Sequence, residues 1–249
     1  MQCRRVTDGL LCRLTRQMVL RVPPEQHHEL HMVLMRAQAL GFLGPVPVVK
    51  HVDHALEMIG VCEAIGLHER LLDLGSGGGV PGLVMGAVWQ SSAIVLLEVN
   101  RRRAAFLRDG IRTLSISDRV SVLSARAEDA GRLAEHRAQF DMVVARGFGR
   151  PGVVAECGAP FLRKGGKLVV SEPPARDAGS SSVMLEQRGL ARRSGDPLPR
   201  WPAAGLSLLG LKSVGIRGER FRFQVLELGS ACPEKYPRRV GVPDKRPVF

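Results

Sequence analysis

Leu72-Asp73-Leu74-Gly75-Ser76-Gly77-Gly78-Gly79-Val80-Pro81-Gly82 is the stretch that decides the fold of this chain. A short apolar segment leads into a turn made mostly of glycine, and an apolar helical pattern follows over residues 80–88. Strand, glycine-rich loop and helix in this order build a binding site for a nucleotide-like cofactor at a helix N-terminus. Glycine is expected in the loop because the backbone turns sharply and lies close to the ligand.

The chain has 249 residues, of which 45% are hydrophobic, which is enough for one large α/β domain with an extension or for two small domains. No apolar run approaches the ~20 residues of a membrane span, and no signal-peptide pattern is seen. The five cysteines are scattered without a C-x-x-C pair, which fits free thiols in a reducing compartment. We therefore expect a cytoplasmic protein without a membrane anchor or a metal site.

The formal net charge of +12 favours a polyanionic partner such as a nucleic acid. A generally basic composition of the source organism's proteins explains the charge equally directly. Aromatic residues make up only 4% of the chain, so base-stacking surfaces are scarce.

From residue 70 onward, apolar segments of strand length alternate with helical patterns. Strands are expected at residues 70–74, 94–98, 120–123, 141–145 and 167–171, and helices at 80–88, 101–114, 128–134 and 153–162. Such alternation predicts a parallel sheet with helices on both faces. Residues 206–214 and 221–228 read as a hairpin that adds an antiparallel strand.

The regions outside this alternation suggest three parts. Residues 1–66 form a helical extension with helices near 24–40 and 52–65, residues 67–230 form the main domain, and residues 231–249 form a basic tail. A loop at 179–182 is expected to precede a helix that ends near residue 189.

Polar side chains follow several of the predicted strands. Right-handed crossovers bring the carboxyl ends of parallel strands to one edge, where ligands bind in open α/β sheets. Asp73, Glu98, the Arg126-Ala127-Glu128 turn and Arg146 are all expected at that edge.

Two cofactors fit the glycine loop. Residues 77–82 match the dinucleotide pattern G-x-G-x-x-G, and Glu98 follows at about the expected spacing for an acid that binds ribose. Asp73 favours S-adenosylmethionine instead, because a carboxylate there attracts the ammonium of a methionine moiety but repels a pyrophosphate. The antiparallel hairpin also favours S-adenosylmethionine, because dinucleotide-binding domains usually continue with parallel strands.

These residues also carry a family resemblance. From about residue 50 to residue 228, the chain resembles the small-subunit ribosomal RNA guanine-N7 methyltransferase G family, also called glucose-inhibited division protein B. The matching motifs are the loop at 73–82 with Pro81-Gly82, Glu98 with the basic cluster 101–103, the turn 126–128, the strand from Phe140 to Arg146, the turn 162–167 and the tail 236–247.

The resemblance implies a Rossmann-like class I methyltransferase fold, α/β, with a seven-stranded, mostly parallel sheet and an antiparallel last strand. It implies N7-methylation of a guanine in 16S ribosomal RNA, with ribosomal RNA or the small ribosomal subunit as partner and the enzyme acting as a monomer. Guanine N7 carries a lone pair and no proton, so no general base is needed and no catalytic residue is assigned. The residues expected to bind the cofactor are Asp73, Gly75, Ser76, Gly77, Val80, Glu98, Ala127, Glu128 and Arg146.

The chain departs from the family where the substrate is expected to enter. Gly44-Pro45-Val46 replaces the family's Asn-Leu-Thr, residues 50–55 replace its Arg-His-Ile-Leu-Asp-Ser, and Ser171-Glu172-Pro173-Pro174 replaces its Lys-Gly. Three alternatives therefore stay open: a methyltransferase with another substrate, a non-catalytic RNA-binding module, and a nicotinamide oxidoreductase. The arginines at 101–103 and the tail cations either contact RNA phosphates or belong to a solvated helix face and a disordered tail.

Overall fold

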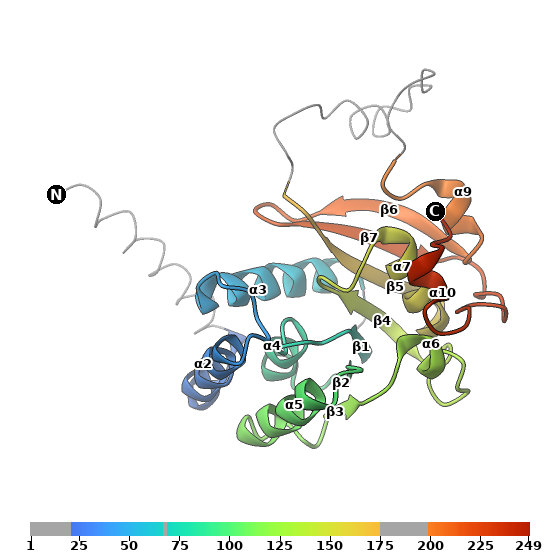
Figure 1. The fold of residues 1–249 in the computed structure, drawn as a ribbon. Coiled ribbons are helices and arrows are strands. Elements are labelled where there is room, and N and C mark those ends of the chain that lie inside the picture. Colours follow the sequence, from blue (N-terminus) through green and yellow to red (C-terminus); the bar gives the residue numbers. More distant parts are fainter. Residues whose placement is uncertain (1–20, 67–68, 175–198) are drawn as a thin grey trace.

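The computed structural model describes residues 21–66, 69–174 and 199–249, and a single sheet lies at its centre (Figure 1). The strand order is β3-β2-β1-β4-β5-β7-β6. The strands are β1 (Arg70–Leu74), β2 (Ala93–Leu97), β3 (Val120–Leu123), β4 (Phe140–Ala145), β5 (Leu162–Glu172), β6 (Leu211–Arg217) and β7 (Arg222–Leu228). Strands β1 to β5 pair in parallel, whereas β7 is antiparallel to both β5 and β6. The mostly parallel, seven-stranded sheet expected from the sequence is confirmed.

Helices cover both faces of the sheet (Figure 1). One face carries α2 (Pro24–Ala39), α3 (Val48–Ile65), α4 (Gly82–Val88) and α5 (Arg101–Thr113). The other carries α6 (Ala127–Ala130), α7 (Pro151–Gly158), the 3₁₀ turn η1 (Ala159–Phe161), α9 (Ala203–Ser207) and α10 (Val242–Lys245). Alternate strand residues point to opposite faces, so Leu71 packs in the first core and Leu72 in the second.

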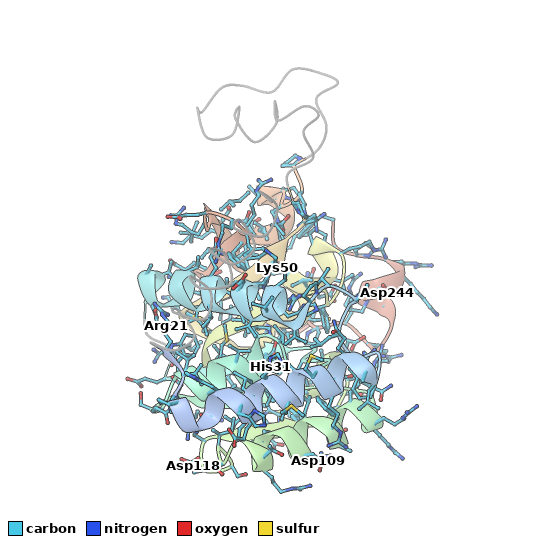
Figure 2. The ribbon with its side chains drawn as sticks, turned by 90° about the vertical axis from the view of Figure 1, so that its left-hand side faces the viewer. Arg21, His31, Lys50, Asp109, Asp118 and Asp244 are labelled. Atoms are coloured by element: carbon cyan, nitrogen blue, oxygen red, sulfur yellow. The ribbon has the colours of Figure 1, made fainter. Side chains whose placement is uncertain are left out.

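The two N-terminal helices pack into the body of the molecule. Leu34 of α2 and Ile59 of α3 are fully buried in the same apolar core as Leu83 of α4. The loop between α2 and α3 lies against the glycine loop, because a Cβ on Gly78 would lie 2.7 Å from both the Phe42 carbonyl oxygen and Leu43 Cγ. The glycine loop therefore depends on the N-terminal helices for its packing. Figure 2 looks onto the outer side of this layer, where Lys50 of α3 and His31 of α2 are exposed.

Helix α3 also holds the hairpin at the far edge of the sheet. The Glu57 carboxylate oxygen Oε1 accepts backbone N–H groups from Glu219, Arg220 and Phe221, at 2.6, 2.8 and 3.1 Å. These donors form the turn between β6 and β7. Helix α3 thus packs in the same core as α4, which follows the glycine loop, and also binds the β6–β7 turn.

Several element boundaries differ from the sequence prediction. Residues 206–214 do not form one strand: Leu206 belongs to α9, and β6 begins only at Leu211. Leu206 and Leu209 are fully buried while Leu208 is 48% exposed, which is the three-residue spacing of a helical turn. The loop expected at 179–182 and the helix expected to end near residue 189 lie outside the described residues.

The helices around η1 are shorter than predicted. Helix α7 ends at Gly158 and is followed by η1, because Pro160 has no N–H with which to continue an α-helix. Helix α6 ends at Ala130, so the predicted helix over 128–134 spans a single turn. Strand β5 begins already at Leu162, with a register shift against β4 between Phe140 and Met142.

The basic tail is an ordered part of the structure, so the disordered-tail alternative is wrong. Arg238 binds the fully buried carboxylate of Glu156 through its backbone N, Nε and Nη2, at 2.8, 2.8 and 2.6 Å. Tyr236 is also buried, and Phe249 packs edge-on against Trp201. Arg238 therefore anchors the tail to α7 through Glu156, and its guanidinium is not free to bind an RNA phosphate.

Within the described residues, no helix is both long and apolar enough to cross a bilayer. The same residues contain no group of three or more side chains suited to hold a metal ion.

Candidate cofactor and acceptor site

Four of the predicted site residues lie at one edge of the sheet, where β1, β2, β3 and β4 end. The N–H groups of Gly75 and Ser76 bind the Leu97 carbonyl at 2.9 and 3.0 Å, so the glycine loop begins beside the end of β2. Glu98 follows β2 and Arg146 follows β4, while Glu128 lies in the turn after β3. The topology thus brings together side chains that are far apart in the sequence.

Asp73 lies beneath the loop and is 1% exposed. Its Oδ2 accepts the N–H of Gly82 at 3.1 Å, and Ser76 Oγ donates to the Asp73 carbonyl oxygen at 3.1 Å. Burial raises the pKa of the Asp73 carboxyl to about 7, against the opposing effects of Ser76, Gly82 and the Arg146 cation. A buried carboxyl with a pKa near neutral pH ionises readily when a cation binds beside it.

The glycines of the loop mostly make room for protein atoms. A Cβ on Gly82 would collide with Asp73 Oδ2, and one on Gly75 would lie 2.6 Å from Phe148 Cδ2. Gly75 also has a φ of +77°, which disfavours any side chain. At Gly75 and Gly82 the packing of the protein itself therefore requires glycine, so these two positions do not by themselves indicate a ligand.

Glu98 connects the glycine loop to the start of α5. The carboxylate is 4% exposed, and it accepts the N–H of Gly77 on Oε2 at 2.9 Å and the N–H of Asn100 on Oε1 at 2.8 Å. Asn100 in turn caps α5 by accepting the N–H groups of Arg102 and Arg103. Each carboxylate oxygen keeps a further lone pair for a hydroxyl donor.

Arg146 is held by a histidine on α3. Its Nη2 donates to His51 Nδ1 at 2.6 Å, and His51 Nε2 lies 3.2 Å from the Gly44 carbonyl oxygen. Since a guanidinium only donates, His51 is neutral, with its proton on Nε2. Burial lowers the pKa of His51, and the Arg146 cation lowers it further. Burial likewise lowers the pKa of Arg146, and the Asp73 carboxylate opposes that shift.

The turn after β3 is closed by the tail. Ala127 and Glu128 are 6% exposed, and Glu128 Oε1 accepts the N–H of Gly241 at 3.0 Å. Arg126 Nη2 lies 3.4 Å from the same oxygen. The tail motif thus holds a turn that the sequence assigns to cofactor binding.

Sequence reasoning missed part of this edge. No role in the site is expected for His51 from the sequence, yet it is the partner of Arg146. His54 Nε2 lies 2.7 Å from Ser171 Oγ, and burial lowers the pKa of His54 to about 3, so its ring is neutral. The only signal in the sequence was the pair of histidines at 51 and 54 on a helix that precedes the loop.

The site fits S-adenosylmethionine by the chemistry of its unpaired groups. Arg146 Nη1 is buried and has no hydrogen-bond partner in the described parts of the chain. A buried cationic N–H without an acceptor is costly, and a ligand carboxylate would satisfy it. Asp73 supplies the complementary acid for an ammonium, and Glu98 supplies acceptors for ribose hydroxyls. The described residues thus offer partners for the ammonium, the carboxylate and the ribose hydroxyls of that cofactor.

Comparison with known proteins agrees with this chemistry. The family model described as rRNA small subunit methyltransferase G matches residues 44–172, which include the glycine loop, Glu98, Glu128 and Arg146. A protein of that name from Thermotoga petrophila is 36% identical over 184 residues, covering 74% of this chain and 73% of the relative. The chain belongs to the rRNA small subunit methyltransferase G family. This membership confirms the resemblance and makes the chain a methyltransferase.

Other relatives extend the match. The rRNA small subunit methyltransferase G of Rubrobacter xylanophilus is 33% identical over 221 residues, which cover 86% of this chain and 78% of the relative. A solved O-methyltransferase from Bacillus cereus, in complex with SAH, has a TM-score of 0.54 at 16% identity, and the match covers 87% of this chain and 97% of that one. The latter likeness concerns the fold alone, and it confirms the class I methyltransferase architecture of this methyltransferase G family member.

Proposed function

We propose that this chain transfers a methyl group from S-adenosylmethionine to N7 of a guanine in small-subunit ribosomal RNA. The observation that carries the proposal is the family match over the residues that build the loop and the sheet edge. The proposal includes a cytoplasmic location, where ribosomal subunits are found, and action as a monomer on RNA or on the small subunit.

Each polar residue at the edge has a role in this proposal. Ionised Asp73 binds the ammonium of the methionine moiety, Arg146 Nη1 binds its carboxylate, and Glu98 accepts the ribose hydroxyls. Gly75, Ser76, Gly77 and Val80 supply the loop surface, and Ala127 and Glu128 border the adenine. When bound, S-adenosylmethionine supplies a methyl group activated on a sulfonium.

The chain's part in the reaction is alignment. Guanine N7 offers a lone pair and no proton, so the protein has no proton to remove. The tie from His51 to Arg146 fixes one end of the cofactor site, and the buried Asp73 fixes the loop. Positioning of this kind supplies several kcal/mol of a transfer barrier, roughly 7–11 at the upper limit.

Two measurements test the proposal. Calorimetry with S-adenosylhomocysteine is expected to show one site per chain, and no binding would overturn the cofactor assignment. Small subunits from a strain that lacks this gene are expected to accept a labelled methyl group from the purified protein, with the modified guanine located by primer extension.

A second candidate is methylation of a different acceptor. It is favoured by Ser171 and Glu172, which stand where the family resemblance predicts Lys-Gly. This candidate would be supported if the protein binds S-adenosylhomocysteine but transfers no labelled methyl group to ribosomal RNA.

A further inference from the structure

A cavity of about 270 Å³ opens at the ends of β4 and β5. Its walls include Phe148 and Pro151 after β4, Ser171 and Glu172 at the end of β5, and Arg200 and Trp201 ahead of α9. The Phe148 ring also lies against Gly75 of the glycine loop. Phe148 therefore forms a wall shared by the cavity and the loop, and a group in the cavity lies next to the proposed cofactor site.

One buried carboxylate is fixed in the wall of this cavity. The Glu172 side chain is 6% exposed, and Trp201 Nε1 donates to its Oε1 at 2.7 Å. Arg200 Nε lies 2.6 Å from Oε2. Both partners also line the cavity, so they act as positioning residues for the carboxylate. An ionised carboxylate has about four lone-pair sites, so each oxygen still accepts one more hydrogen bond.

The walls suit a single planar base. Phe148 and Trp201 offer aromatic surface, and stacking on aromatic side chains contributes to base binding without regard to sequence. Pro151, Val154 and Pro173 add apolar surface. The volume lies just below the usual range of ligand pockets, about 300–1,000 Å³, so it fits one base rather than a dinucleotide.

An acceptor-only carboxylate selects among the four bases. Guanine presents two adjacent donors, N1–H and the N2 amino group, on its Watson–Crick edge. Adenine and cytosine each place a ring acceptor beside their amino group, and uracil has one N–H between two carbonyl groups. Guanine alone offers the two neighbouring donors that a carboxylate can accept.

We propose that this cavity receives the acceptor guanine, flipped out of its RNA, and that Glu172 reads the N1–H and N2 amino donors. The inference rests on the proposed function and specifies how that site recognises its base. Enzymes that modify bases commonly extrude the target and read its Watson–Crick edge in a snug pocket. Binding through that edge leaves N7 free on the Hoogsteen edge. Lysine, which the family resemblance predicts in this segment, would offer donors and no acceptor.

The test measures binding of GMP, IMP and AMP to the full chain in the presence of S-adenosylhomocysteine. The chain has two tryptophans, so a Trp89→Phe background leaves Trp201 as the fluorescent reporter in the cavity wall. IMP keeps N1–H and lacks the 2-amino group, whereas AMP lacks both donors. We expect GMP to bind roughly tenfold or more tighter than IMP or AMP, and to quench Trp201.

Two matched variants separate base reading from the ion pair. Glu172→Gln is expected to lower the affinity for GMP to about the affinity for IMP, while the affinity for IMP itself changes little. Arg200→Gln removes one positioning partner, while Trp201 still holds Oε1, so GMP and IMP are both expected to bind more weakly and the preference for GMP over IMP to remain. Equal binding of the three nucleotides, absence of binding at millimolar concentration, or an equal loss of GMP and IMP in Glu172→Gln would overturn the inference. Should Glu172→Gln fail to fold, the inference is tested by the ratio of the GMP and IMP affinities in the Trp89→Phe protein alone, and a ratio near one would overturn it.

Methyl transfer to small-subunit RNA is measured alongside and separates the two proposals. Transfer by the wild type without GMP preference overturns the cavity assignment alone. Selective GMP binding that depends on Glu172, without transfer to ribosomal RNA, supports the cavity and overturns the proposed function.

Discussion

Arg146 donates from Nη2 to Nδ1 of His51 over 2.6 Å, which joins the end of β4 to helix α3. The two residues are far apart in the sequence, and the bond fixes the guanidinium beside Asp73 at the proposed cofactor site. Because the pKa of His51 is lowered, its ring stays neutral and keeps accepting this bond throughout the neutral pH range.

His51→Ala is expected to reduce methyl transfer. Without His51, neither terminal nitrogen of Arg146 has a hydrogen-bond partner among the residues that the structure describes, and an unsatisfied buried donor costs about 1–3 kcal/mol. We expect kcat/KM to fall roughly tenfold, as measured by labelled-methyl transfer. His28→Ala, on the exposed side of α2, is the control.

A double-mutant cycle makes this prediction specific. In an Arg146→Met background, His51→Ala is expected to cause little further loss, because the bond is already absent. Additive losses from the two changes would contradict a role of His51 through Arg146.

Cofactor affinity is expected to rise with pH around neutrality. In the free protein the pKa of Asp73 is raised to about 7, so below that pH the carboxyl is mainly protonated. An ammonium ligand binds the ionised form, so binding releases a proton and weakens about tenfold per pH unit well below pH 7. Calorimetry with S-adenosylhomocysteine between pH 5.5 and about 8.5, in buffers of different ionisation enthalpy, measures the released proton.

Asp73→Asn supplies the control for this pH dependence. The amide keeps an acceptor for the Gly82 N–H but has no proton to release, so its affinity is expected to be lower and nearly flat with pH. An unchanged pH profile in Asp73→Asn would assign the released proton to another group.

The tie between the tail and α7 is expected to govern stability. In Arg238→Met, the fully buried carboxylate of Glu156 loses its cationic partner and becomes an uncompensated buried charge. Breaking a buried pair in this way costs about 3–5 kcal/mol. Urea unfolding measures the loss, and Arg239→Met, at the exposed neighbour, is expected to change stability by no more than about 0.5 kcal/mol. Equal effects of the two substitutions would contradict the tie.

The start of α5 is expected to contact RNA phosphates. Arg101 and Arg102 are exposed in the first turn of α5, whereas Arg103 lies over the Phe42 ring at 5.7 Å. Changing Arg101 and Arg102 to Gln is expected to weaken RNA binding and to reduce the slope of log K against log salt by about 2. Arg112→Gln near the end of α5 is the control, and an unchanged slope in the double variant would remove these residues from the RNA contact.

The sequence predicts those features that depend on where a strand ends. Asp73, Glu98 and Arg146 each follow an apolar segment, and parallel topology alone brings such positions to one edge. It does not predict the bond from His51 to Arg146, the tie from Glu128 to Gly241, or the contact between Glu172 and Trp201. These pairings depend on how α3, the tail and the segment before α9 pack on the sheet, which no local pattern encodes.

Strand β7 follows β6 in the chain but lies between β5 and β6 in the sheet. Until residues 211–228 have been synthesised, β5 therefore has an unpaired edge that includes the apolar stretch Leu168-Val169-Val170. Such an edge can add strands from other molecules, and long-range pairings form slowly. Local closure of the β6–β7 hairpin before docking shortens the exposure. The aggregates expected during slow folding of this chain thus begin at β5, the strand whose end carries Glu172.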